Sequence, residues 1–242
     1  MPEPLKKVRS LLKSDSSVMH LEAGASKAMT AAIERAIQPI DPLPKPVTFE
    51  QFIDWYPENS QYRYELRRGV IIQRPKPSGK HSEIAGFIHD ELAIEIRRAG
   101  QPYFIPRECV IKVSDDTAYE PDAIVLDRAA LAAEPLWEKA STVEKGTSVK
   151  LAIEVVSTNW QDDYELKLAA YESMQISEYW IVDYAGLGGV RHLGRPKQPT
   201  LTICTLVEGE YEVSRFRKDE QILSPLFPQL TPIANHFFTA SK

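Results

Sequence analysis

Two acidic residues, Asp122 and Glu154, each lie beside a short apolar segment of the 242-residue chain. Asp122 directly precedes Ala-Ile-Val-Leu at 123–126, and Glu154 lies within Leu-Ala-Ile-Glu-Val-Val at 151–156. Short apolar runs rich in β-branched residues predict buried strands, and a charge beside a buried strand is costly unless a partner compensates it. A divalent cation held between the two carboxylates would do so. The alternative is two unrelated acids at strand ends, each bonded to a loop.

The overall composition is that of a soluble globular protein, with 43% hydrophobic residues and a net charge of −5. An acidic total argues against a protein that coats nucleic acid over its whole surface, but it permits one local basic groove. The two cysteines, Cys109 and Cys204, lack metal-site spacing and favour buried thiols in a reducing compartment. Because we find neither a membrane-length apolar run nor a signal-peptide core, we expect a cytoplasmic protein without membrane spans.

The first 46 residues are predicted to lie outside the folded domain. Residues 41–46, Asp-Pro-Leu-Pro-Lys-Pro, contain three prolines, which remove backbone donors and disfavour helix before them. We therefore expect an N-terminal extension and proline-rich linker at 1–46, including a short helix from Met29, and one domain at 47–242. The extension begins with several basic residues and is expected to be either a flexible tail or an arm that contacts nucleic acid.

Two helices and a hairpin are predicted in the first part of the domain. Thr48 begins a capping-box pattern for a short helix at 49–56. Residues 64–72 are typical of two short strands around a turn at Arg68-Gly69. Apolar residues then recur every four positions, which predicts a long helix from about His81 to Arg98, ended by Gly100.

Six strands and a second main helix are predicted in the rest of the domain. We expect one strand within 103–113, central strands at 123–126 and 151–156, and a third at 178–183. A polar stretch at 127–148 separates the central strands and is expected to hold one helical turn and a loop. Residues up to Met174 suit a helix whose inner side carries Leu166, Ala169, Ala170 and Met174. The segments 201–206 and 211–216 predict an antiparallel C-terminal hairpin.

This order of elements, together with several short motifs, resembles the PD-(D/E)xK nuclease superfamily, and more closely the Uma-type family of restriction-endonuclease-like proteins. The likeness covers about residues 47–235, and it is specific because the motifs occur in one order at matching spacing. The matching pieces are Tyr-Glu-Leu-x-x-Gly at 64–69, His81, Pro121-Asp122, Ile-Glu-Val-Val-Ser at 153–157, Asp162-Asp163, Lys167, Tyr171 and Glu-Tyr-Trp-Ile-Val-Asp at 178–183.

The resemblance implies an α/β fold with a restriction-endonuclease-like mixed central sheet flanked by helices, to which the antiparallel C-terminal strands would be added. It also implies an endonuclease that hydrolyses phosphodiester bonds of DNA. Asp122, Glu154 and the backbone carbonyl of Val155 would hold Mg²⁺, for which Mn²⁺ could substitute, because hard cations prefer oxygen ligands. The cation would polarise the phosphate and lower the pKa of an attacking water.

One residue departs from the superfamily pattern. The catalytic lysine is expected two residues after the second acid, where this chain has Val156. The likeness to the Uma-type family implies that Lys167 on the following helix takes its place. The alternative is a surface ion pair between Lys167 and Asp163, four residues earlier, which would contribute little stability.

Further candidates surround these residues. The resemblance places Glu65 near the metal, as a ligand or through water, and we expect Asp162 and Asp163 to cap a helix or to orient Lys167. Tyr171 is expected to pack beside that lysine or support it, and Trp180 to lie in the core. The segment 63–81 is rich in basic residues around Glu65 and is a candidate phosphate-binding surface, with the residues His81, Arg67, Arg68, Arg74, Lys76 and Lys80.

Two other functions stay open from the sequence alone. The chain could be a catalytically inactive nucleic-acid-binding or partner-binding protein that keeps a nuclease fold, or a metal-dependent hydrolase of small phosphoesters. A second basic group, Arg191, Arg195 and Lys197, is compatible with nucleic-acid binding but also with a solvated loop. Homodimerisation is compatible with double-strand cleavage, and no interface is recognisable in the sequence.

Overall fold

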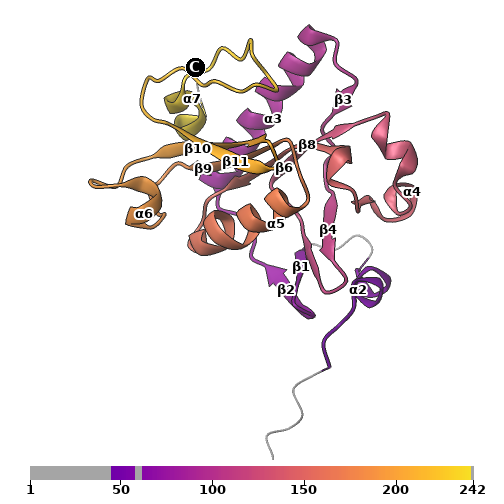
Figure 1. Cartoon of the computed structure of the whole chain (residues 1–242). Coiled ribbons are helices and arrows are strands. Elements are labelled where there is room, and N and C mark those ends of the chain that lie inside the picture. Colours follow the sequence, from indigo (N-terminus) through magenta and orange to yellow (C-terminus); the bar gives the residue numbers. More distant parts are fainter. Residues whose placement is uncertain (1–44, 58–61, 241–242) are drawn as a thin grey trace, which may run out of the picture. The chain divides into compact units, whose positions relative to one another are not determined.

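The computed structural model describes residues 45–57 and 62–240, and the predicted extension and linker at 1–46, with its helix from Met29, lies almost wholly outside these residues. The unit that begins at Pro46 contains a six-stranded sheet in the order β11-β10-β9-β8-β6-β3 and a five-stranded sheet in the order β2-β1-β5-β4-β7 (Figure 1). Both sheets mix parallel and antiparallel pairs. The predicted mixed α/β fold is confirmed, although the sequence did not indicate that the strands divide into two sheets.

The five-stranded sheet is built on the predicted hairpin. Its strands are β1 (Arg63–Arg67), β2 (Val70–Arg74), β4 (Val110–Ser114), β5 (Thr117–Tyr119) and β7 (Thr142–Val143). The turn at Arg68-Gly69 is confirmed, and both residues have positive φ angles of 48° and 75°. A Cβ on Gly69 would lie 2.4 Å from the Pro46 side chain, so glycine is required there both by conformation and by space.

Helix α2 (Phe49–Trp55), which the sequence predicts at 49–56, packs on this hairpin. Thr48 Oγ1 accepts a hydrogen bond from the Gln51 N–H at 3.3 Å, and Gln51 Oε1 accepts one from the Thr48 N–H at 3.0 Å. This capping box satisfies two backbone donors at the start of the helix. Phe49 and Phe52 are buried against Leu66, which fixes one face of β1 and turns its alternate residues to the other side.

The six-stranded sheet is covered on both faces by helices (Figure 1). Its strands are β3 (Tyr103–Phe104), β6 (Ala123–Asp127), β8 (Val149–Val155), β9 (Glu178–Asp183), β10 (Thr200–Val207) and β11 (Glu210–Phe216). The three central strands β6, β8 and β9 are almost fully buried, which accounts for their continuous apolar sequences. Trp180 is buried in β9, as predicted, and its Nε1 donates to Glu178 Oε2 at 2.9 Å.

One face of this sheet packs against α3 (Gly79–Ala99) and α7 (Ala234–Thr239) through apolar residues such as Ile84, Ile88 and Leu92. The long helix begins two residues before the predicted position, where Ser78 Oγ accepts from the His81 N–H at 3.2 Å, and ends at Gly100 with a left-handed φ. The predicted stripe of residues therefore faces the sheet. The described residues contain no helix long and apolar enough to span a membrane.

The opposite face packs against η4 (Asp162–Lys167), a π-helical turn that continues directly into α5 (Leu168–Ser173). The shorter elements η2 (Ala130–Ala133), α4 (Trp137–Ala140), η3 (Gly146–Ser148) and α6 (Val190–Leu193) complete this side of the described chain. The stretch 127–148 is thus more structured than the single helical turn and loop expected from its polar sequence.

Two predicted elements are wrong in detail. The strand expected within 103–113 is split between the two sheets, with Pro106 in the connection, because proline cannot supply the backbone donor that a continuous strand requires there. On the second main helix, Leu166 and Ala169 are exposed, and Tyr164, Lys167 and Tyr171 point inward instead. The prediction assumed 3.6 residues per turn, whereas a π-helical turn rotates the following residues around the helix axis.

Gly146 holds the end of α5 close to the start of β8, because a Cβ at this position would lie 1.8 Å from the Met174 carbonyl oxygen. We expect Gly146→Ala to lower the free energy of unfolding strongly, by roughly 2 kcal/mol or more, since backbone would have to move. Gly86→Ala is the matched control. Gly86 is an exposed position of helix α3 at which a Cβ would meet nothing within 4 Å, so the substitution should stabilise the protein by about 0.5–1 kcal/mol. Urea denaturation of both variants measures the difference, and equal stabilities would contradict the steric argument.

Candidate active site

The register of β6 and β8 brings the two predicted acids together. The strands are antiparallel, with Ala123 opposite Ile153, so Asp122 just before β6 lies across from Glu154 in β8. Residues directly opposite each other in an antiparallel pair carry side chains on the same face. Glu154 alternates with Ile153 and Val155, which point toward α3, and therefore faces η4 and α5.

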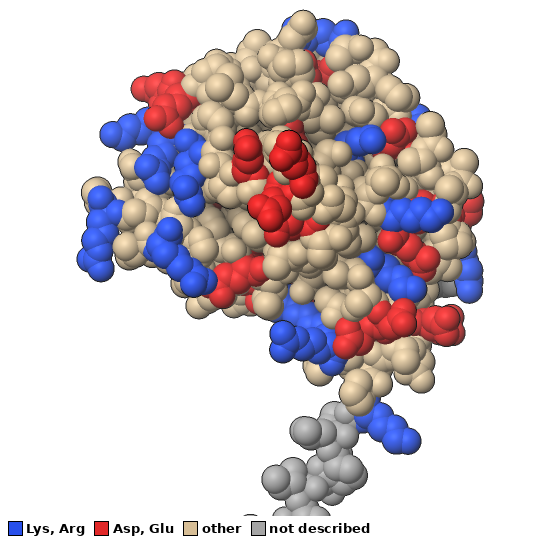
Figure 2. Space-filling view, viewed as in Figure 1, with Lys and Arg blue, Asp and Glu red and all other residues tan. Residues whose placement is uncertain are grey.

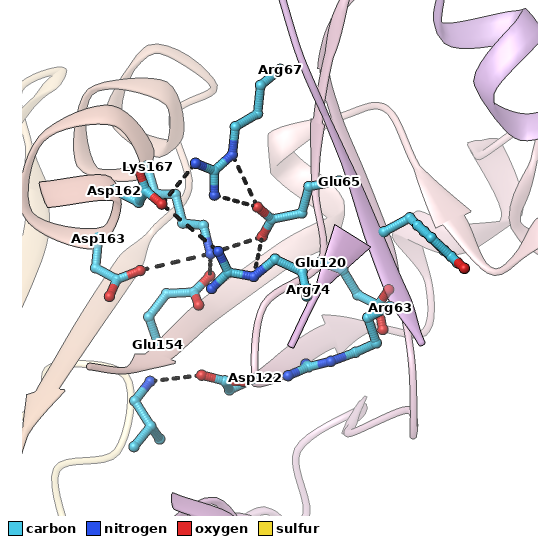
Figure 3. Close-up of polar contacts among 12 residues, drawn as sticks. Arg63, Glu65, Arg67, Arg74, Glu120, Asp122, Glu154, Asp162, Asp163 and Lys167 are labelled. Atoms are coloured by element: carbon cyan, nitrogen blue, oxygen red, sulfur yellow. Dashed lines mark hydrogen bonds and ion pairs between the residues drawn. The ribbon is translucent and has the colours of Figure 1, made fainter. Parts of the chain in front are cut away.

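Asp122 is held by three donors from three segments, and Figure 3 shows it beside one of them, Arg63. Its Oδ2 accepts from the Val155 backbone N–H at 2.9 Å and lies 3.1 Å from His81 Nε2. Its Oδ1 accepts from Arg63 Nη2 at 2.8 Å. Burial disfavours ionisation, but the His81 and Arg63 interactions outweigh it and hold the pKa of Asp122 well below its ordinary value. Asp122 is therefore a fixed anion at neutral pH.

Lys167 extends from the π-helical turn into a group of carboxylates (Figure 3). Its Nζ lies 2.8 Å from Glu154 Oε1, 3.0 Å from Glu65 Oε1 and 3.7 Å from Asp163 Oδ1. The lysine side chain has no exposed surface. Burial lowers the pKa of Lys167, but the neighbouring acids raise it further, so the net direction is upward and the ammonium stays charged. A surface pair with Asp163, the alternative considered above, is wrong.

Two arginines from the hairpin complete this ion-pair network. Arg67 Nη2 lies 2.6 Å from Glu65 Oε2, and Arg67 Nη1 lies 2.7 Å from Asp162 Oδ2. Arg74 is farther from the same two acids, at 3.8 Å and 3.7 Å. Burial raises the pKa of Glu65, but Lys167, Arg74 and Arg67 together outweigh it, so the net direction is downward.

Glu154 is the acid of this group whose ionisation costs most. Burial raises its pKa well above the ordinary value, and the nearby Asp122, Asp163 and Glu65 raise it further, while Lys167 opposes them. Arg63 and the hairpin arginines compensate Asp122 and Glu65, whereas Glu154 shares Lys167 with Glu65 and Asp163 and has no arginine within ion-pair distance among the described residues. Such an arrangement favours a cation.

A cavity of about 250 Å³ opens beside Asp122 and contains basic and hydroxyl side chains. Its lining includes Arg63, Arg74, Lys76, Ser78, His81, Ser157, Thr158, Tyr184 and Leu187. A carboxylate that faces a cavity with this many donors could lie next to a bound phosphate.

The family comparison matches residues 49–236 to the Uma2 model, which is described as "Putative restriction endonuclease". The match covers more than half of the chain. The chain belongs to the Uma2 family. Among curated proteins, no relative matches it.

A solved structure supports the same fold for this Uma2 protein. It is a crystal structure, titled as a "putative nuclease belonging to DUF820", from Anabaena variabilis. The two chains superpose with a TM-score of 0.61 at 20% sequence identity, over 81% of this chain and 99% of the other. At this identity the comparison establishes a shared fold alone, which agrees with the mixed α/β fold expected from the sequence.

The Uma2 chain brings Asp122, Glu154, Glu65 and Lys167 into one place, and Val155 contributes its backbone N–H. Val156, where the superfamily lysine was expected, is buried in the core. Tyr171 is buried too, and its hydroxyl donates to Glu154 Oε1 at 3.4 Å. Asp162 contacts the hairpin arginines and not Lys167.

The predicted phosphate-binding residues divide into different environments. His81, Arg74 and Lys76 line the cavity, whereas Arg67 is engaged by Glu65 and Asp162 inside the protein. Lys80 pairs with Glu83 and donates to the Thr239 carbonyl oxygen. Arg68 lies exposed at the turn, at the opposite end of the hairpin from the Arg63–Arg74 pair.

Sequence reasoning missed the direct contact between Arg63 and Asp122. The signal was available in the strand period, because Arg63, Glu65 and Arg67 alternate along β1 and so share the face that looks toward the site. Tyr64 and Leu66 pack with α2 on one side of β1, so the residues that alternate with them must lie on the side of the candidate site.

The donor set at this site fits Mg²⁺ in its chemistry. Asp122 and Glu154 offer hard carboxylate oxygens, and a bound cation would oppose the rise in the Glu154 pKa that burial and the neighbouring acids cause. Within residues 45–57 and 62–240, no group of three or more His, Cys, Asp or Glu side chains is arranged to hold a metal ion. A cation here would therefore be bound by two carboxylates, backbone oxygen and water. Such a ligand set suits Mg²⁺, which usually keeps several waters and is seldom enclosed by protein ligands alone.

Lys167→Met should lower the free energy of unfolding by about 3–5 kcal/mol, because it leaves buried carboxylates without their shared cation. Lys80→Met removes an exposed lysine paired with Glu83 and should cost no more than about 1 kcal/mol. Urea denaturation at pH 7 measures both variants. A Lys167→Met protein as stable as Lys80→Met would mean that the buried network contributes no net stability.

Glu120 provides a pH-dependent prediction. Burial raises its pKa to about 7, although a hydrogen bond from the Tyr56 hydroxyl at 2.9 Å opposes the shift. A carboxyl with a raised folded-state pKa contributes stability below its unfolded value, and this contribution is lost as the pH rises through about 7. Glu120→Gln keeps the hydrogen bond without the charge, so it should raise the melting temperature more at pH 8 than at pH 5. An increase of equal size at both pH values would contradict the shift.

Proposed function

We propose that the chain is a Mg²⁺-dependent endonuclease that hydrolyses phosphodiester bonds of DNA. The observation that carries the proposal is the pairing of Asp122 with Glu154 across β6 and β8, with Lys167 against Glu154 and a donor-rich cavity beside Asp122. Membership of a family described as restriction endonucleases supports a nuclease, and the proposal adds the metal and the substrate to that description.

Asp122, Glu154 and the Val155 carbonyl oxygen would hold the cation, and Mn²⁺ would substitute for Mg²⁺. When bound, the cation supplies charge for the phosphate oxygens and lowers the pKa of a water molecule for in-line attack. The role of the protein is to keep the oxygen ligands in place and, at Asp122, ionised. The Val155 N–H and His81 do this for Asp122 through Oδ2, which leaves Oδ1 on the side of Arg63.

In this proposal Lys167 is a positioning residue for Glu154. Its ammonium holds Glu154 Oε1 at 2.8 Å and opposes the rise in the Glu154 pKa that burial causes. Glu65 fixes the lysine from the other side at 3.0 Å, and the two hairpin arginines fix Glu65. Glu65 thus acts on the site through Lys167.

Substrate phosphates would bind the basic residues around the cavity. Arg63, Arg74 and Lys76 line it, together with Tyr184 and Leu187. Beyond Leu187, the second basic group follows, with Arg191 on α6 and Arg195 and Lys197 after it. Figure 2 shows one face of the protein, on which Lys and Arg gather toward the side of α6 while acidic side chains cluster near the middle. Local basic groups of this kind could track a phosphate backbone despite the acidic total.

Asp122→Asn and Glu154→Gln should each reduce plasmid cleavage in Mg²⁺ or Mn²⁺ by at least about 100-fold, because each removes a charged oxygen ligand with little change in shape. Asp90→Asn, at a position on α3 whose side chain is 79% exposed, is the matched control and should cleave like the wild type. Chelator should stop cleavage by the wild type.

Cleavage by Asp122→Asn at the wild-type rate would reject this assignment of the active site. Salt-sensitive DNA binding that Asp122→Asn leaves intact, without turnover in any metal, would favour the inactive binding protein. Turnover of chromogenic phosphoesters in place of DNA would favour a small-phosphoester hydrolase.

A further inference from the structure

The two oxygens of Asp122 are held in different ways. Oδ2 is tied to the framework by the Val155 backbone N–H and by His81 on the long helix. Oδ1 faces Arg63 alone among the contacts of the described residues, at 2.8 Å from Nη2. Oδ1 can therefore change its partner without any loss of the bonds that orient the carboxylate.

Arg63 also differs from the other two arginines of the hairpin. Arg67 and Arg74 each contact two acids, Glu65 and Asp162, in the buried network. Within the described residues, Asp122 is the one acid within ion-pair distance of Arg63. The Arg63 side chain is 30% exposed and lines the cavity. It can leave Asp122 and move into the cavity while the network around Lys167 stays intact.

The guanidinium of Arg63 supplies positive charge to Asp122 Oδ1, as a bound divalent cation would. A guanidinium and a divalent cation on the same carboxylate oxygen repel each other, because like charges at such a distance are poorly screened in a partly buried site. One of the two must be displaced when the other binds.

We propose that Arg63 and the divalent cation compete for Asp122 Oδ1, and that Arg63, once displaced, binds a phosphate oxygen of the substrate. This inference rests on the proposed function for the identity of the cation and the substrate. It assigns Arg63 two successive partners: the carboxylate before the cation binds, and the phosphate afterward. A planar guanidinium suits both, because carboxylate and phosphate oxygens accept the same N–H donors.

Titration calorimetry with Mn²⁺ alone tests the competition without any turnover. Arg63→Gln should bind Mn²⁺ with a Kd roughly two- to five-fold lower than the wild type, the size expected for loss of a partly exposed ion pair. Arg63→Lys keeps the charge and should bind Mn²⁺ as the wild type does. Arg107→Gln removes the same charge from a side chain that is 95% exposed, and should leave the Kd unchanged.

A double-mutant cycle locates the effect at Asp122. In an Asp122→Asn background, the Arg63→Gln change should no longer alter the Mn²⁺ Kd, since the shared oxygen has lost its charge. At saturating Mn²⁺, DNA cleavage by Arg63→Gln should have a raised KM, so that kcat/KM falls more than kcat does. Thermal unfolding of each variant checks that the fold is retained.

An unchanged or weaker Mn²⁺ affinity in Arg63→Gln would overturn the competition. Absence of Mn²⁺ binding by the wild type and by every variant would overturn both the competition and the metal dependence of the proposed function. The wild type could bind Mn²⁺, and Arg63→Gln bind it more tightly, while neither protein cleaves DNA. That result would support the competition and reject the nuclease activity, so the two failures are distinguishable.

Discussion

The fully buried ammonium of Lys167 is the interaction on which the rest of this structure depends. An unpaired charge at this depth would be prohibitive, and its contacts with Glu154 and Glu65 at 2.8 and 3.0 Å make it tolerable. Those acids come from both sheets, because Glu65 lies in β1 and Glu154 in β8. One lysine therefore joins the two sheets electrostatically at the candidate site, and the arginines of the hairpin then balance the remaining negative charge.

The strand register and the helix geometry both follow from this requirement. The antiparallel pairing of β6 and β8 places Asp122 across from Glu154, and the π-helical turn carries Lys167 to the inner side. Single π-helical turns are uncommon and often accompany functional sites. Here the turn has a definable effect, because it exposes Leu166 and buries a lysine.

The sequence was sufficient to predict most elements that carry strong periodicity or a capping motif. Helices α2 and α3, the first hairpin and the C-terminal hairpin were predicted, because their turn glycines and apolar spacing are local signals. The division into two sheets was not predictable in this way, since strand partners far apart in the chain leave no local signal. The position of Lys167 near Glu154 was predicted from resemblance to a family. Its burial was not predicted, because a period of 3.6 residues per turn places Leu166 and not Lys167 on the inner side of the helix.

The same limit applies to the candidate site. Asp122 and Glu154 could be selected because a charge beside an apolar strand is anomalous at the level of sequence. Their partners could not, because a contact such as Arg63 to Asp122 depends on how the hairpin packs on the central sheet. Basic residues that looked equivalent in the sequence became different in the structure: Arg67 neutralises internal acids, and Lys76 lines a cavity. Local charge density gave the region of the candidate site but not the role of each side chain.

The two-sheet construction has a consequence for when the site can exist. Arg63 and Asp122 are 59 positions apart, and Lys167 follows later still, so the contacts that join the two sheets at the site are non-local. Non-local contacts form late in folding, after the loops between them have closed. During synthesis the hairpin emerges before Lys167, so Glu65 is made before the lysine with which it pairs. A chain that is incomplete, or whose sheets have not docked, therefore holds the separate residues of the candidate site without their assembled geometry.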